Sequence, residues 1–220
     1  DIHHLLPQSG LFIVGEHFQR VNHQLLAPKG ATLEGLREAH SHVHALSQCH
    51  KYLRGRGLKP VVHVDTAGAA REVAERNDPT VAAIASDLAA EIYGLEILAA
   101  GIEDAEHNTT RFIVMARAPD DPGPSAGPVM TSFIFQVRNV PAALYKGLGG
   151  FATNGVNMVK LESYQIGGSF NATLFYADIE GHPSERNVEL ALEELEFFST
   201  SIRVMGTYPA HPYRREVAAF

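Results

Sequence analysis

Two short stretches of the chain combine polar side chains that could bind an anionic substrate. The first, residues 41–49, places the hydroxyl of Ser41 at a predicted helix N-terminus, where free backbone N–H groups favour an anion. Gln48 lies seven residues further on, two helical turns away on the same face. The second, residues 108–112, brings an amide, two hydroxyls and a guanidinium together in front of an apolar strand. Many donors and few acceptors suit a substrate that carries carboxylates and a hydroxyl.

Two further junctions between a predicted strand and a predicted helix carry hydroxyl groups, at Thr66 and at Ser86. In an open α/β sheet, such junctions face the crevice in which ligands bind. Each of the four features also has an ordinary structural interpretation, as a helix N-cap, a surface glutamine or a solvated turn. Taken together, the four favour a small anionic ligand.

The sequence offers no convincing motif of a common cofactor or nucleophile site. It contains no G-x-x-x-x-G-K-[ST] and no G-x-G-x-x-G, and its G-x-S-x-G match at residues 123–127 lies in a proline-rich segment and not between a strand and a helix. Cys49 lies in an apolar helical run, which favours a small buried side chain over a nucleophile. His40, His42 and His44 do not share one helical face, and no cysteine or paired carboxylate completes a ligand set. These residues therefore have ordinary structural interpretations and do not by themselves indicate a metal or nucleophile site.

Composition narrows the class of protein further. The 220 residues are 45% hydrophobic, which is enough to bury a core, and their net charge of -7 argues against nucleic acid or an anionic membrane as the main partner. No stretch approaches the roughly 18 uninterrupted apolar residues of a membrane helix. A single cysteine cannot form an intramolecular disulfide, so we expect a cytoplasmic protein. The chain begins at Asp1 without a methionine, and we expect a further part of its first domain upstream.

Residues 1–117 alternate between strand-like and helix-like runs, which predicts an α/β domain with a largely parallel or mixed sheet. The expected strands are 11–14, 23–27, 60–64, 81–84 and 111–115. The expected helices are 42–54, with Ser41 as its N-cap and Gly55 just past its end, 67–76, and 87–93 after Ser86. Four prolines and two glycines within residues 118–128 predict a linker.

Residues 129–208 show a different pattern, followed by a tail at 209–220. Alternating apolar residues predict strands at 133–137, 159–161, 170–176 and 202–204, the third after a turn at Gly167-Gly168. Apolar residues at helical spacing predict helices at 144–151 and 188–198. The order βαββαβ over these 80 residues predicts an α+β ferredoxin-like domain.

Motifs in both halves resemble those of one enzyme family, prephenate dehydratase with its appended ACT domain. The catalytic motifs are Ser41-His42-x-x-Ala45-Leu46-x-Gln48-Cys49, Asp65-Thr66-Ala67-x-Ala69-Ala70, Ala82-Ala83-Ile84-Ala85-Ser86 and Asn108-x-Thr110-Arg111-Phe112. The ACT motifs are Ala143-Leu144, Gly155-Val156-Asn157 and Lys160-Leu161-Glu162-Ser163. The resemblance runs in order from about Leu11 to Tyr208.

The resemblance implies a reaction and a fold. Prephenate loses its ring hydroxyl and its ring carboxylate, the latter as CO2, and becomes phenylpyruvate in L-phenylalanine biosynthesis without any cofactor. The catalytic region would share the two-lobed fold of type II periplasmic binding proteins. It would be incomplete at its N-terminus here, because the family's Gly-rich segment and Glu-Asn-Ser motif have no counterpart after Asp1.

The family pattern also implies roles for individual residues. Thr110 corresponds to the key catalytic residue, and a threonine hydroxyl titrates too high to be a free acid, so we expect it to donate a hydrogen bond to the departing oxygen. Ser41 and Gln48 would be catalytic residues that orient the substrate. Substrate-binding roles are expected for Asn108, Arg111, Phe112, Thr66 and Ser86. Arg111 would either bind a substrate carboxylate through two hydrogen bonds or point away along the strand and form an ion pair within the protein.

The ACT domain implies feedback regulation by L-phenylalanine and a homodimer or homotetramer that covers the edges of its sheet. The expected effector-binding residues are Ala143, Leu144, Gly155, Asn157, Glu162 and Ser163. The family's Gly-Ala-Leu-Val reads Ala-Ala-Leu-Tyr at 142–145, and its Glu-Ser-Arg-Pro reads Glu-Ser-Tyr-Gln at 162–165. Two alternatives remain, namely arogenate dehydratase, whose substrate has an amine in place of the keto oxygen, and a non-catalytic amino-acid sensor.

Overall fold

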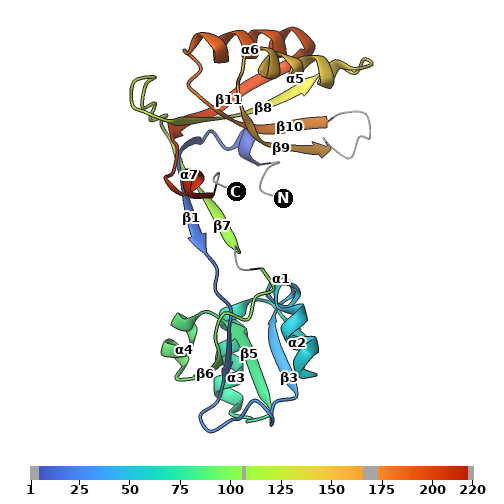
Figure 1. Ribbon diagram of the computed structural model, residues 1–220, viewed down its shortest axis with the longest axis vertical. Helices are drawn as coiled ribbons and strands as arrows, with labels where there is room; N and C mark the ends of the chain where they lie inside the picture. Colours follow the sequence, from blue (N-terminus) through green and yellow to red (C-terminus); the bar gives the residue numbers. More distant parts are fainter. Residues whose placement is uncertain (1–4, 106–107, 166–172, 218–220) are drawn as a thin grey trace. The chain divides into compact units, whose positions relative to one another are not determined.

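The computed structural model describes residues 5–105, 108–165 and 173–217 (Figure 1). The chain forms two compact units, which we call unit 1 (residues 1–18 and 111–220) and unit 2 (residues 19–110). Unit 2 is therefore inserted in the sequence of unit 1. Residues 111–117, which the sequence groups with the preceding α/β region, pack in unit 1 together with residues 129–208.

Unit 2 is built on a five-stranded mixed sheet, in agreement with the predicted α/β region. The strand order is β4 (Lys59–His63), β3 (Glu38–His42), β5 (Val81–Ala85), β2 (Gln24–Ala27) and β6 (Glu96–Ala99). Strand β3 runs parallel to both β4 and β5, whereas β2 runs antiparallel to β5 and to β6. The parallel strands β3 and β4 are each followed by a helix, so their carboxyl ends share one edge of the sheet.

The helices of unit 2 are α1 (Val43–Gln48), α2 (His50–Arg56), α3 (Thr66–Arg76) and α4 (Asp87–Tyr93). The single helix predicted at 42–54 is thus wrong, because the chain breaks at Cys49 into two short helices. Ser41 is not its N-cap, since it lies within β3 and the ring of His42 accepts from the backbone N–H of His44 instead. The second helix ends at Gly57, whose φ of 67° suits the left-handed C-cap, and not at Gly55.

Two apolar cores cover the two faces of this sheet. The central strand β5 alternates between them, since Ala82 and Ile84 pack with α1 and α2 while Val81, Ala83 and Ala85 pack with α3 and α4. The N-caps of α3 and α4 are local, because Asp65 accepts from the backbone of Gly68 and Ser86 from that of Ala89. Unit 2 is therefore a layer of strands between two layers of helices (Figure 1).

Unit 1 contains a four-stranded antiparallel sheet in the order β11 (Ser199–Pro209), β8 (Val129–Val137), β10 (Thr173–Glu180) and β9 (Met158–Gln165). Helices α5 (Ala143–Thr153) and α6 (Arg186–Phe198) lie side by side on one face (Figure 1). The chain order of these six elements is βαββαβ. The predicted turn at Gly167-Gly168 lies outside the described residues.

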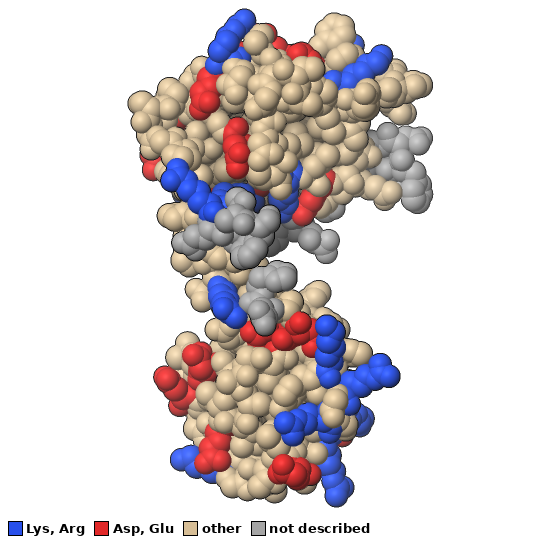
Figure 2. Space-filling view, viewed as in Figure 1, with Lys and Arg blue, Asp and Glu red and all other residues tan. Residues whose placement is uncertain are grey.

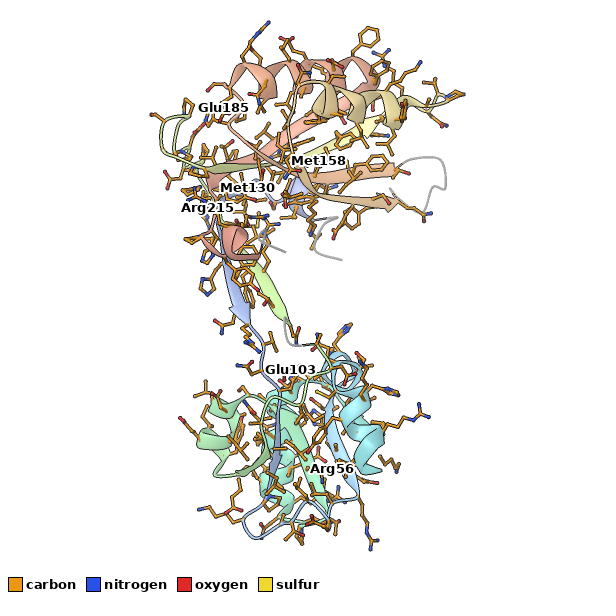
Figure 3. All side chains as sticks on the ribbon, in the orientation of Figure 1. Arg56, Glu103, Met130, Met158, Glu185 and Arg215 are labelled. Carbon is orange, nitrogen blue, oxygen red and sulfur yellow. The ribbon has the colours of Figure 1, made fainter. Side chains whose placement is uncertain are left out.

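The opposite face of this sheet is covered by the 3-10 helix η2 (Leu6–Gln8) and by the strand pair β1 (Phe12–Arg20) and β7 (Thr109–Ala116). The C-terminal helix α7 (Tyr213–Val217) packs beside β1, where the rings of Tyr213 and Phe18 stack. Ile13 is buried there against Met130, Tyr176 and Tyr208. Figure 3 labels Met130, which belongs to this core, and Met158, which packs on the helical face.

Gly206 permits the closest approach between β11 and β1. A Cβ atom at this position would lie 1.9 Å from the carbonyl oxygen of Ile13, so no other residue type fits without moving the backbone. The predicted linker is also attached to unit 1, since Asp121 accepts a hydrogen bond of 2.8 Å from the ring of His182.

Charged side chains of both signs are interspersed on the face of the molecule that Figure 2 shows. In the described ranges, no helix is long and apolar enough to cross a membrane.

Candidate functional site

A hollow of about 450 Å³ opens on unit 2, where the parallel strands β3 and β4 give way to α1 and α3. It is lined by Val21, His23, His42, His44, Ala45, Gln48, Val64, Asp65, Thr66 and Thr110. Three of the residues predicted to act on a substrate, Thr110, Gln48 and Thr66, thus share one concave surface. Its position at the carboxyl ends of parallel strands is the one expected for a ligand site in an open α/β sheet.

Thr110 presents an exposed hydroxyl to this hollow from strand β7. Among the residues that the structure describes, none forms a hydrogen bond with that hydroxyl. It is therefore available as a donor to a bound molecule, and its removal leaves no protein group unpaired.

Gln48 and Asn108 form a reciprocal pair of amides at the same place. The Nε2 atom of Gln48 donates to Oδ1 of Asn108 over 3.2 Å, and Nδ2 of Asn108 donates to Oε1 of Gln48 over 3.2 Å. The backbone carbonyl of Asn108 accepts from Val21 over 2.8 Å, which fixes the segment that carries Thr110 beside the entry to β2. The structure therefore brings Asn108 next to Gln48, as the sequence predicted for a shared site.

The junction of β4 and α3 supplies a positive helix end. Thr66 is the first residue of α3, and Asp65 accepts from the Gly68 backbone at 2.5 Å. The Asp65 carboxylate is occupied by this cap, while the imidazoles, the amide and the hydroxyls of the lining can all donate. A hollow with this balance, at the N-terminus of an eleven-residue helix, suits an anionic ligand.

Two predicted site residues within unit 2 do not line this hollow. Ser41 is fully buried in β3, and its hydroxyl donates to the carbonyl of Ile84 at 2.6 Å, because β3 lies between β4 and β5 and its inward polar group must be satisfied. Ser86 caps α4 through its side chain and does not line the hollow. Both residues therefore have structural roles in unit 2.

Arg111 follows Thr110 directly but is engaged within unit 1. Its three guanidinium nitrogens contact Glu16 at 2.6 Å, Asp178 at 2.5 Å and the hydroxyl of Tyr208 at 2.7 Å. Of the two roles considered for Arg111, structural pairing is the one that the structure shows, because every nitrogen already has a partner. Phe112 is 53% exposed and does not line the hollow of unit 2.

The network around Arg111 is charge-balanced and buried. The Glu16 carboxylate also accepts from Arg214 at 2.6 and 2.8 Å and from the backbone of His211. Burial opposes ionisation of Glu16, but the hydrogen bonds from Arg214 and His211 and the charge of Arg111 outweigh it, so the pKa of Glu16 is lowered. Burial likewise opposes the charge of Arg111, and its anionic and phenolic neighbours more than compensate, so its pKa is raised.

Cys49 and the three histidines His40, His42 and His44 do not form a catalytic or metal-binding cluster. Cys49 is buried, and burial, followed by the nearby carboxylates of Glu103 and Asp104, raises its pKa to about 12. The burial predicted from its apolar surroundings is confirmed. Over the described ranges, no group of three or more His, Cys, Asp or Glu side chains is placed to hold a metal ion.

A second hollow, of about 390 Å³, lies in unit 1 at the start of α5. Ala143 and Leu144 line it, together with the end of β8 and Phe175 of β10. Ala142, which precedes the helix, adopts a left-handed φ of 62°, a conformation that favours glycine. Two of the predicted effector-binding residues therefore share a concave surface.

The other predicted effector-binding residues lie elsewhere in unit 1. Gly155 follows the opposite end of α5, and Asn157 donates to the carboxylate of Glu180 at 3.1 Å. Glu162 and Ser163 lie on β9, which is an edge strand. Because neighbouring residues of a strand point to opposite faces, Glu162 and Ser163 do not face the same side of the sheet.

His23 is the residue of the hollow in unit 2 that the sequence did not single out. It lies just before β2, is only 6% exposed and places Nε2 at 2.7 Å from Oε1 of Gln48. A histidine next to an apolar strand has no local signal for this role, because its partner lies 25 residues away in the sequence.

The chain is similar to a known protein family and to individual members of it. The model of the family described as prephenate dehydratase matches residues 1–120. A bifunctional N-acyl-homoserine lactone acylase/prephenate dehydratase of Komagataeibacter europaeus is 53% identical over 216 residues, which cover 98% of this chain and 77% of that protein. Arogenate dehydratase/prephenate dehydratase 2 of Arabidopsis thaliana is 40% identical, and the match covers 93% of this chain and 56% of that protein. The chain thus spans little more than half the length of the plant relative.

A solved structure is similar to most of the chain. The crystal structure of prephenate dehydratase from Arthrobacter aurescens in complex with L-Phe is 29% identical and matches with a TM-score of 0.79. The match covers 91% of this chain and 66% of that chain.

Proposed function

Because the chain belongs to the prephenate dehydratase family, we propose that it converts prephenate to phenylpyruvate, a step of L-phenylalanine biosynthesis. The observation that carries this proposal is the donor-rich hollow of unit 2, in which Thr110, Gln48 and Thr66 come together within the part of the chain that the family model matches. Prephenate is a dicarboxylate with a ring hydroxyl, and its carboxylates suit such a surface.

The reaction requires the protein to orient the substrate and to assist the departure of the ring hydroxyl. The bond between the ring and its carboxylate breaks to release CO2, its electron pair makes the ring aromatic, and the ring hydroxyl leaves and takes up a proton to become water. Thr110 would donate a hydrogen bond to the departing oxygen, where one well-placed donor contributes roughly 3 kcal/mol. Gln48 and Thr66 would hold the carboxylates, and no cofactor takes part.

Arogenate is the second candidate substrate, because the name of the Arabidopsis thaliana relative includes both activities. The deciding experiment incubates the full chain with prephenate and with arogenate in parallel and measures phenylpyruvate and phenylalanine. A higher kcat/KM for prephenate supports the proposal. No product from either substrate, together with binding of an aromatic amino acid, would favour the non-catalytic sensor.

A further control covers the other activity in the name of the Komagataeibacter europaeus relative. The same preparation is tested for release of the acyl chain from an N-acyl-homoserine lactone. Turnover of this substrate by the Thr110→Val variant, at the rate of the unchanged protein, would show that a second site is responsible for it.

For the sequence region 1–117 we propose a fold like that of type II periplasmic binding proteins, with unit 2 as one lobe. The mixed sheet with helices on both faces and the ligand-sized hollow at its edge support this assignment. For residues 129–208 we propose an ACT domain, supported by the βαββαβ order and by the sheet order β11-β8-β10-β9. The linker at 118–128 and the tail at 209–220 complete this division.

We further propose that the ACT domain binds L-phenylalanine between two copies of the chain. Of the predicted residues, Ala143 and Leu144 line the hollow at the start of α5, Gly155 and Asn157 follow the other end of that helix, and Glu162 and Ser163 lie on the edge strand β9. A single copy therefore does not bring all six together. Val159 and Leu161 on β9 are 39% and 40% exposed, and an unpaired edge strand with apolar side chains is suited to pairing with a second copy. Tyr164, at the position of the family's Arg, donates to the Glu162 carboxylate within the chain.

Calorimetry with millimolar L-phenylalanine and light scattering test this regulatory proposal together. We expect binding heat, inhibition of turnover and a dimer or tetramer. The Leu161→Lys variant should shift the protein toward monomer and weaken the binding of phenylalanine. Full binding by a monomeric variant would contradict the shared site.

A further inference from the structure

His23 and Gln48 are held at a fixed distance by one loop, residues 102–104. The backbone N–H of Ile102 donates to the carbonyl of His23 at 3.0 Å, and that of Asp104 donates to the carbonyl of Gln48 at 2.6 Å. The carboxylate of Glu103, labelled in Figure 3, accepts from the backbone N–H of His23 at 2.9 Å. The contact between the two side chains is therefore imposed by the backbone of three separate segments.

This contact determines which way the amide of Gln48 points. Its Oε1 atom lies 2.7 Å from Nε2 of His23 and also accepts from Asn108. An amide oxygen can only accept, so Nε2 of His23 must carry a proton. One N–H of Gln48 donates to Asn108, and no acceptor among the described residues takes the other. That second N–H belongs to a side chain that lines the hollow.

We propose that His23 is a positioning residue that orients the Gln48 amide so that its free N–H donates to a carboxylate of the substrate. This inference rests on the proposed dehydratase function. The imidazole is buried, and its hydrogen bond prevents the amide from turning by 180° and presenting its oxygen to an anion. The hollow would otherwise offer the carboxylate a repelling acceptor at this place.

The orientation can be measured without any turnover. In the reverse arrangement, with both amides turned, Nε2 of His23 would accept a hydrogen bond and the ring proton would lie on Nδ1. Nitrogen NMR of the labelled full chain, at a pH where the ring is neutral, distinguishes the two tautomers. We expect the Nε2–H form for His23, and the Nδ1–H form would overturn the proposal.

Kinetics then test the effect on the substrate. An amide that holds a carboxylate stabilises the bound substrate and the transition state alike, so His23→Leu should raise KM for prephenate about tenfold and change kcat by less than about threefold. His23→Gln, which can donate from nearly the same place, should keep KM within about threefold of the original value. An unchanged KM in His23→Leu, or an equal loss in both variants, would overturn the proposal.

Two comparisons separate positioning from general damage. In a Gln48→Met background, His23→Leu should raise KM by less than about twofold, because its effect passes through Gln48. His40 is also a buried histidine of unit 2, bonded to Glu38 at 3.2 Å and outside the hollow. His40→Leu should lower stability and leave KM unchanged, and a rise equal to that of His23→Leu would refute the assignment. If the unchanged protein converts neither prephenate nor arogenate, the proposed function fails, and the tautomer still decides the orientation.

Discussion

Replacement of Thr110 by valine removes one hydroxyl and changes little else. Valine has nearly the same shape and suits a strand as well as threonine does. Thr110 is exposed, and none of the described residues bonds its hydroxyl, so the free energy of unfolding should change by less than about 0.5 kcal/mol. The variant therefore isolates whatever the hydroxyl does for a bound molecule.

The expected cost to the reaction follows from the role of a single donor. Loss of one preorganised donor to a developing negative oxygen costs about 2.7 to 4 kcal/mol. At 1.36 kcal/mol per factor of ten, this corresponds to a loss of roughly 100- to 1,000-fold in kcat. KM should change little, because the bond strengthens mainly as the ring oxygen departs.

The assay measures phenylpyruvate formed from prephenate at saturating substrate, together with urea unfolding of the same preparations. Thr110→Ser is the matched control, since it keeps the hydroxyl and loses only the methyl group. We expect it to retain kcat within about tenfold. A Thr110→Val enzyme with nearly normal kcat would remove Thr110 from the mechanism. A large loss of stability would instead show that the hydroxyl has a structural role.

Three further predictions concern the stability of unit 1, measured by urea unfolding and by hydrogen exchange of β11. Glu16→Gln should destabilise the unit by about 3 kcal/mol at neutral pH, because Arg111 and Arg214 lose their shared carboxylate. The pKa of Glu16 is lowered on folding, so its carboxylate stabilises the folded protein fully above the unfolded pKa near 4.3. This stabilisation is lost as the pH falls through the folded pKa. The stability of the Glu16→Gln variant should therefore fall less on acidification than that of the original protein. Ala142→Gly should stabilise the unit by about 1 kcal/mol, because it relieves a left-handed φ of 62°, and no gain would contradict that backbone conformation. Gly206→Ala should cost about 3 kcal/mol or more, because the added Cβ meets the Ile13 carbonyl oxygen at 1.9 Å, and a neutral result would disprove the close packing of β1 on β11.

Elements with local signals were predicted well from the sequence. Helix α4 runs over the predicted residues 87–93 after Ser86, because a serine N-cap and a following glycine mark both of its ends. Helix α3 differs from the prediction by one residue at its start. The place of Thr66 at the hollow followed from a local rule, since junctions after parallel strands meet at one edge of a sheet, but the same rule did not hold for Ser86.

Features that depend on distant partners were missed. Strand β3 reads Glu-Ala-His-Ser-His, a polar pattern that becomes a buried strand only because β4 and β5 flank it and Ile84 accepts from Ser41. The break at Cys49 is stabilised by Asp104, whose backbone bonds Gln48 and whose carboxylate accepts from Lys51, more than fifty residues away. No window of the sequence around 41–54 contains that information.

The insertion of unit 2 within unit 1 separates the two folding events in time during translation. All residues of unit 2 have been synthesised once residue 110 is complete, whereas the core around Ile13 is completed only when Tyr208 has been added. At synthesis rates of about 5 to 20 residues per second, the N-terminal strand waits roughly 10 to 40 s for the sheet on which it packs. During that interval Ile13 lacks the residues that bury it in the complete unit, although the chain already contains all of unit 2.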